Sequence, residues 1–139
     1  MKKISTRVFI LLTAAIMAVG CSKPEEPAVP EVKLVGVWKA PFVTCEGMME
    51  DFAGKKLTIN ADHTGSFHYL SFANWKIEGD QLTFSNYFEQ DARRHLELLR
   101  YTISNYADTA MLLTGKYMYI VGDSVYQEAD MSGLFSRER

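Results

Sequence analysis

The chain has 139 residues, with 15 basic against 17 acidic side chains and a net charge of −2. Nucleic-acid binding needs a clustered positive face, so this balance argues against a nucleic-acid partner. Because only two cysteines are present, at most one internal disulfide can form, and we expect the hydrophobic core to stabilise the protein.

The first twenty residues predict a secretory signal peptide. Three basic residues precede an apolar run from Val8 to Val19, and this run is shorter than the roughly 20 apolar residues of a spanning helix. Ala18-Val19-Gly20 stands directly before Cys21, a spacing that resembles the lipobox of bacterial lipoproteins. By that resemblance residues 1–20 are removed, and the lipid on Cys21 anchors the protein to a membrane.

Loss of the signal peptide removes three basic residues, which leaves 12 against 17 acidic ones and a net charge of −5. Residues 21–30 predict a lipidated cysteine and a flexible tether, because prolines and glutamates occur there without a packing pattern. Residues 31–139 are then one domain. Lipidation leaves Cys45 without an intrachain partner, and we expect a buried thiol at this position and not a nucleophile.

The first half of the domain consists of short segments with alternating apolar side chains or glycine-rich boundaries. We predict strands at 34–39, 55–60, 66–72 and 74–78. Between them we predict an acidic loop or one helical turn at 46–54, which holds Glu46, Glu50 and Asp51, and tight turns at 61–65 and 79–80.

The second half predicts longer strands, at 81–87, 95–104, 109–121 and 132–137, with loops at 88–94 and 122–131. In the strand at 95–104, Leu98 and Arg100 lie on one face, and Leu99 and Tyr101 lie on the other. About eight short strands without a long helix indicate an all-β fold, a small antiparallel up-and-down barrel. A closed barrel also removes exposed strand edges.

Four short motifs resemble the lipocalin-like lipoproteins that are abundant in Bacteroidetes. Leu34-Val35-Gly36-Val37-Trp38 resembles the Gly-x-Trp first strand of lipocalins. The other three, which are similar to two hairpins and the closing strand of that family, are Asn60-Ala61-Asp62-His63-Thr64-Gly65-Ser66-Phe67, Trp75-Lys76-Ile77-Glu78-Gly79-Asp80-Gln81-Leu82 and Phe135-Ser136-Arg137.

This resemblance implies a lipocalin-like barrel closed at one end by Gly36, Trp38 and Arg137, with the guanidinium group of Arg137 stacked on the Trp38 ring. It also implies a lipid-anchored protein of the bacterial outer membrane. The acidic tether after Cys21 looks like the export signals of some surface lipoproteins, so a periplasmic and a surface-exposed location both remain open.

No motif in the sequence predicts an enzyme. Neither a G-x-S-x-G nucleophile context nor a glycine loop for phosphate is present. His63, His68 and His95 have no spacing typical of zinc ligands, and we expect them on the surface. We therefore expect no catalytic site, no metal and no cofactor.

Aromatic residues make up 12% of the chain, and they suggest two functions. The first is binding of a small apolar ligand in the barrel mouth. Candidate pocket residues, taken as inward-facing from the alternation, are Phe67, Tyr69, Trp75, Phe84 and Leu98. The alternative is a filled barrel that contacts a protein of the cell envelope through its loops or through an exposed aromatic face.

Overall fold

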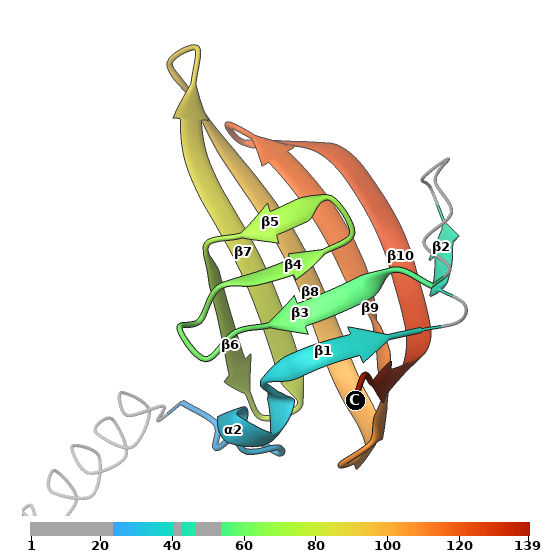
Figure 1. Ribbon diagram of the computed structural model, residues 1–139. Coiled ribbons are helices and arrows are strands. Elements are labelled where there is room, and N and C mark those ends of the chain that lie inside the picture. The colour runs from blue at the N-terminus through green and yellow to red at the C-terminus, as the bar shows by residue number, and fades with distance from the viewer. Residues whose placement is uncertain (1–23, 41–42, 47–53) are drawn as a thin grey trace, which may run out of the picture.

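The computed structural model describes residues 24–40, 43–46 and 54–139. Its short helix is α2 (Glu31–Leu34). The strands are β1 (Gly36–Lys39), β2 (Val43–Glu46), β3 (Lys56–Ile59), β4 (Gly65–Phe67), β5 (Leu70–Phe72), β6 (Asn74–Glu78), β7 (Gln81–Gln90), β8 (Arg93–Ala107), β9 (Ala110–Val121) and β10 (Ser124–Arg137) (Figure 1). The predicted signal peptide, Cys21 and most of the predicted acidic loop lie outside the described residues.

Nine strands form one antiparallel sheet in the order β5-β4-β3-β1-β10-β9-β8-β7-β6, and β2 pairs with β10 beside this path. The sheet curls until β5 contacts β7, so that the barrel is nearly closed. The predicted small up-and-down barrel is thus confirmed, with nine strands in its wall. Because β1 pairs with β10, Trp38 lies directly opposite Arg137.

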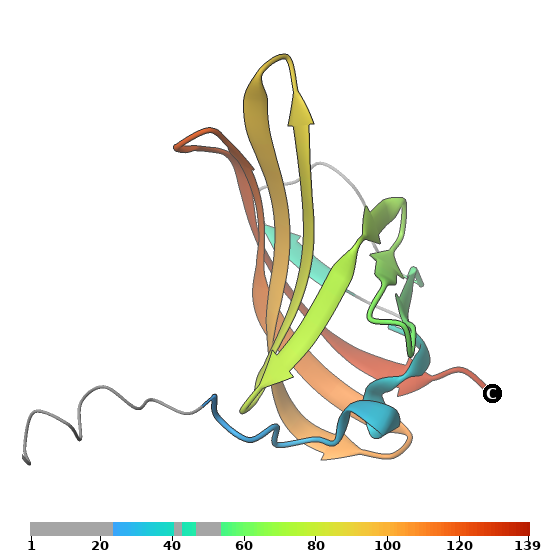
Figure 2. The ribbon, with the colours of Figure 1, turned by 90° about the vertical axis from the view of Figure 1, so that its left-hand side faces the viewer.

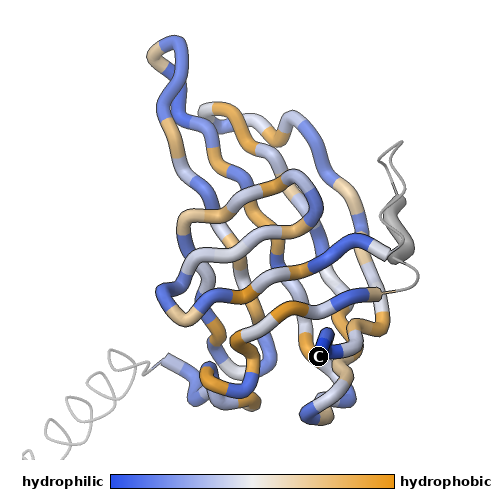
Figure 3. The backbone as a smooth tube through the Cα atoms, viewed as in Figure 1, coloured by the Kyte–Doolittle hydropathy of each residue, from blue (hydrophilic) through white to orange (hydrophobic). Residues whose placement is uncertain are grey.

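The two ends of the barrel differ. We call the end at α2 and at the β6–β7 and β8–β9 turns the closed end, and the end at the β7–β8 and β9–β10 turns the open end. Figure 2 shows that the two long hairpins extend past the short strands β3, β4 and β5 at the open end. The tip of the β7–β8 hairpin is mainly hydrophilic, whereas apolar residues recur nearer the closed end (Figure 3).

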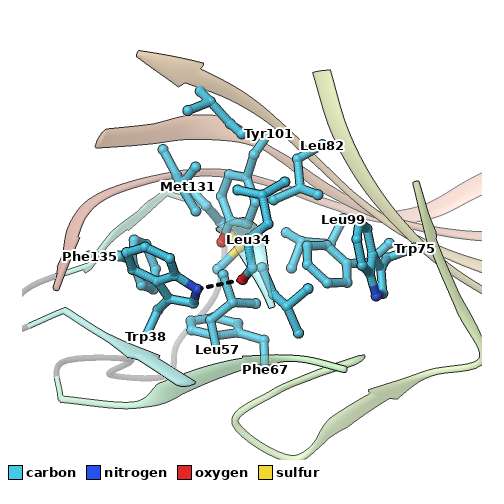
Figure 4. Close-up of a cluster of buried hydrophobic side chains, with 14 of the residues drawn as sticks. Leu34, Trp38, Leu57, Phe67, Trp75, Leu82, Leu99, Tyr101, Met131 and Phe135 are labelled. Atoms are coloured by element: carbon cyan, nitrogen blue, oxygen red, sulfur yellow. Dashed lines mark hydrogen bonds between the residues drawn. The ribbon is translucent and has the colours of Figure 1, made fainter. Parts of the chain in front are cut away.

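The core fills the space between the short strands and the lower halves of the long ones. Alternation places one side chain in two inside the barrel, and the large side chains packed there are Trp38, Leu57, Phe67, Phe84, Leu99, Tyr101 and Phe135, each fully buried (Figure 4). The Trp38 indole Nε1 donates to the carbonyl oxygen of Leu34 at 2.8 Å. The tryptophan therefore keeps its polar atom bonded while its ring is buried.

The chain before β1 is packed against the closed end over a longer stretch than the sequence predicts. Val29 is 4% exposed and belongs to the core, and the backbone N–H of Ala28 donates to the carbonyl oxygen of Gly79 at 2.8 Å. The chain expected to be a flexible tether through Pro30 is thus already bonded to the barrel from Glu25 onward. The strand predicted at 34–39 begins at Gly36, because α2 occupies the residues before it.

The loops predicted at 88–94 and 122–131 are wrong, because all of these residues except the turns at 91–92 and 122–123 continue the long strands. Asp91 and Ala92 make the β7–β8 turn with φ of 52° and 59°, the left-handed pair that joins two strands tightly. The strand predicted at 66–72 is also wrong as a single element. A turn at His68, where φ is 56°, divides it into β4 and β5.

Candidate functional site

The five residues predicted to line a pocket do not share one environment. Phe67, Trp75 and Phe84 are at most 1% exposed and belong to the core. Tyr69 lies in the turn between β4 and β5 and is 56% exposed. Leu98 pairs with Met118 and Ser85 on the face of the sheet opposite to Leu99, so its predicted inward orientation is wrong.

Trp75 is held by the turn that follows β3. Its indole Nε1 donates to the carbonyl oxygen of Asn60 at 2.8 Å, and its ring stacks on His63 with centroids 4.9 Å apart. Asp62 accepts bonds from the backbone N–H and the hydroxyl of Thr64, and these bonds lower the pKa of the Asp62 carboxyl group. The Asn60–Gly65 motif therefore forms a fixed turn that receives Trp75.

The residues expected to close the barrel lie together at the closed end. The guanidinium carbon of Arg137 is 4.2 Å from the Trp38 ring centroid. Arg137 donates to three carbonyl oxygens, of Asp108 at 3.0 Å, of Val35 at 2.8 Å and of Lys33. A Cβ on Gly36 would lie 2.7 Å from Nη1 of Arg137, so glycine leaves room for this network, whose role is structural.

A row of aromatic side chains crosses the open end on the inner face of the long strands. We call Phe88, His95, Tyr119 and Tyr126 the aromatic row; they come from β7, β8, β9 and β10 in turn. Phe88 stacks on His95 with centroids 4.9 Å apart. The His95 and Tyr119 rings are 5.8 Å apart, and Tyr119 meets Tyr126 edge to face at 6.0 Å. The four rings thus contact one another in succession, by stacking at one end of the row and edge to face at the other.

A cavity of about 550 Å³ lies against the aromatic row, and its walls are formed by Gln90, Asp91, Arg93, His95, Tyr119, Val121 and Tyr126. The volume is within the range of small-molecule sites, about 300–1,000 Å³. The guanidinium group of Arg93 and the carboxylate of Asp91 add both signs of charge to the aromatic lining. The cavity therefore combines aromatic rings with charged groups.

Hydrogen bonds hold the middle of the aromatic row in place. His95 Nδ1 is 2.6 Å from the Tyr119 hydroxyl, and Nε2 is 3.3 Å from the carbonyl oxygen of Gln90. A carbonyl oxygen only accepts, so in the neutral imidazole the proton is on Nε2, and Nδ1 accepts from Tyr119. Both ring nitrogens are then bonded, which fixes the orientation of the His95 ring.

A polar layer separates the aromatic row from the core. Asn86 donates to the Glu97 carboxylate at 3.3 Å. Glu97 pairs with Tyr119, so Tyr117 is its diagonal neighbour on the inner face. Burial raises the pKa of the Tyr117 phenol to about 12, with smaller contributions from Glu97, Tyr69 and Tyr119. Tyr117 is therefore neutral over the whole physiological range.

The raised pKa of Tyr117 predicts a loss of stability at high pH. The unfolded chain releases this phenol proton near pH 10, whereas the folded protein holds it until about pH 12. Stability is then full below pH 10 and falls by about 2 kcal/mol as the pH rises through this interval. Urea unfolding at pH 9, 10 and 11 measures the slope, which Tyr117→Phe should reduce. Equal slopes in the two proteins would contradict the assignment.

Sequence reasoning did not select the aromatic row. Phe88 and Tyr126 fall in segments predicted as loops, and His95 was expected on the surface. One signal was present, because Tyr117 and Tyr119 alternate on one face of a predicted strand. That pattern places aromatic side chains on the inner face toward the end of β9.

Within the described ranges, no group of three or more His, Cys, Asp or Glu residues is placed to hold a metal ion. In the same ranges no helix is long and apolar enough to cross a membrane. The sequence matches no protein-family model, and no curated protein or solved structure matches the chain.

Proposed function

We propose that this protein is a membrane-anchored, non-enzymatic barrel of the lipocalin-like type that binds a small ligand at its open end. The proposed anchor is the lipid on Cys21, at the bacterial outer membrane. The observation that carries the proposal is the cavity of about 550 Å³ against the aromatic row. It lies at the end of the barrel opposite to the Trp38–Arg137 plug, where the long hairpins leave the inner face accessible.

The lining of the cavity favours an amphipathic ligand over a wholly apolar one. A flat apolar group stacks on, or meets edge to face, the rings of the aromatic row. Arg93 pairs with a carboxylate or a similar anion through its planar guanidinium group. A wholly apolar ligand would bury Arg93 and Gln90 without partners, which costs free energy. The proposed ligand is thus a small planar molecule with one anionic group.

Titration calorimetry of the full chain in detergent with naphthalene-2-carboxylate tests this proposal. We expect Tyr126→Ala to weaken binding about three- to tenfold, because one ring contact contributes about 0.5–1.5 kcal/mol. Tyr126 is 79% exposed, so its truncation should leave folding intact. Tyr87→Ala is the matched control, since Tyr87 is 56% exposed on the outer face of the same sheet. Equal affinity of both variants and the parent protein would contradict the proposed site.

The neutral analogue naphthalene-2-carboxamide tests the role of charge. The parent protein should prefer the carboxylate over the amide, and Arg93→Gln should remove that preference while it retains the amide affinity. If the Arg93→Gln protein still prefers the carboxylate over the amide, a group other than Arg93 binds the carboxylate.

A second candidate function is supported by an apolar patch on the outer face of the long strands, behind the aromatic row. The register places these side chains next to one another: Tyr87, Leu96, Leu98, Met118, Ile120 and Val125. Tyr87 and Val125 are more than half exposed, and such patches are typical of protein contacts. A photoreactive residue in place of Val125 would crosslink to an envelope protein bound there. The Tyr87→Ala substitution should abolish that crosslink. A ligand carrier requires neither result.

A further inference from the structure

We propose that the closed end of the barrel faces the bilayer and that the cavity opens away from it. This inference rests on the lipid anchor at Cys21 that belongs to the proposed function. It concerns the surface that meets the lipid and the side from which a ligand arrives.

The chain is attached to the closed end from Glu25 onward. The backbone N–H of Gly79 donates to the carbonyl oxygen of Glu25 at 3.4 Å, and Ala28 donates to Gly79 at 2.8 Å. Val29 then enters the core with 4% of its surface exposed. We call residues 25–35 the strap. Its first contacts are with the β6–β7 turn, at the opposite end of β7 from the aromatic row.

The second half of the strap is held by the plug of the barrel. The carbonyl oxygen of Lys33 accepts from Arg137 and from the Tyr106 hydroxyl, the latter at 3.2 Å. Leu34 is fully buried and accepts from Trp38. Release of the strap would expose core side chains and remove two carbonyl acceptors from Arg137. The strap is therefore a fixed part of the barrel.

The length of chain between the lipid and the strap decides the orientation. Four residue steps separate Cys21 from Glu25, and at most about 3.6 Å per step gives a reach of about 14 Å. β7 alone extends for 10 residues from the closed end toward the open end, a distance of about 33 Å. The anchor therefore holds the closed end close to the bilayer. The lipid on Cys21 cannot reach the aromatic row at the open end.

Electrostatic attraction to anionic lipid does not favour a barrel that lies flat on the bilayer. Adsorption to anionic lipid requires clustered basic residues, whereas the mature chain carries 12 basic against 17 acidic residues once the three basic residues of the signal peptide are removed. The hairpin tips then project into the aqueous compartment, and a ligand enters the cavity from that compartment and not from the lipid leaflet.

Energy transfer to an acceptor dye on the lipid headgroups tests this orientation. The full lipidated chain, in a Cys45→Ser background, receives a donor dye at Thr109→Cys or at Asp123→Cys before reconstitution into vesicles. Both positions are exposed turn residues at opposite ends of β9, which has 12 residues. We expect at least threefold greater transfer from position 109 than from position 123. Ten glycine and serine residues inserted after Ser22 should reduce the difference.

If the protein binds vesicles but energy transfer is equal from both positions, or greater from position 123, the proposed orientation is wrong. If the protein does not bind vesicles and Cys21→Ser changes nothing, both the anchor and the orientation are overturned. Ligand affinity is measured separately, so a failure to bind naphthalene-2-carboxylate leaves the orientation standing.

Discussion

Replacing Gly115 with alanine is expected to cause a large loss of stability, because the added Cβ would overlap the neighbouring strand. A Cβ at this position would lie 1.9 Å from the carbonyl oxygen of Arg100 and 2.8 Å from the Cα of Tyr101. Both are backbone atoms of β8, which move only if the pairing of β8 with β9 changes. We expect the free energy of unfolding to fall by more than about 4 kcal/mol, measured by urea unfolding or, if no folded protein accumulates, by the loss of soluble yield.

Gly122→Ala, in the turn between β9 and β10, is the matched glycine control. No atom lies within 4 Å of a Cβ added there, although φ is +61°. The cost should therefore be only that of an alanine in the left-handed region, about 1 kcal/mol. If Gly115→Ala unfolds within about 1 kcal/mol of the parent protein, β8 and β9 cannot approach each other as closely as the structure has them.

Replacing Trp38 with alanine is expected to lower the free energy of unfolding by about 3–5 kcal/mol. The side chain is fully buried, and its loss leaves a cavity beneath the guanidinium group of Arg137. It also removes the donor to the Leu34 carbonyl oxygen and the edge contact with Tyr106 at 6.5 Å. Urea unfolding followed by far-ultraviolet circular dichroism measures the change.

Tyr126→Ala is the control for Trp38→Ala, because it removes a large aromatic ring that is 79% exposed. We expect it to change stability by less than about 0.5 kcal/mol. The effects on binding should be reversed. Tyr126→Ala should weaken ligand binding, whereas a change at Trp38 that leaves the protein folded should not, since Trp38 lies far from the cavity. A Trp38→Phe protein that stays folded but loses affinity for naphthalene-2-carboxylate would contradict the separation of plug and site.

The fold class could be predicted because the lower halves of the strands have one face in the core and one in solvent. Ile59 and Leu57 of β3, and Trp75 and Ile77 of β6, alternate with exposed or half-exposed side chains. Such a period of two residues is the direct sequence signature of a half-buried strand. The Gly79 turn between β6 and β7 also follows from its residue type, since φ there is +57°.

The open end could not be predicted, because the strands there have no buried face. From Ser124 to Glu128 every residue of β10 is exposed, and none of the last five residues of β7 is buried. Without burial no alternation is required, so the sequence has the composition of a loop. The Asp91-Ala92 turn also lacks the glycine that marks most two-residue hairpins.

The predicted pocket residues do not line the cavity at the open end, for a related reason. A search for inward-facing aromatic residues finds the best-packed positions, and Phe67, Trp75 and Phe84 are core side chains. In β8, leucines occur on both faces near Leu98 and Leu99, so the pattern does not identify the inner face. The aromatic row depends on four strands meeting in register, which no local pattern encodes.

Chemical-shift mapping of the full chain in detergent during titration with naphthalene-2-carboxylate tests the proposed binding site most directly. We predict that the perturbed amides cluster at Arg93, His95, Tyr119 and Tyr126, on the inner face of the open end. Perturbations confined to the outer apolar patch or to the closed end would contradict binding on the aromatic row. So would the absence of any perturbation at a ligand concentration that saturates the protein in calorimetry.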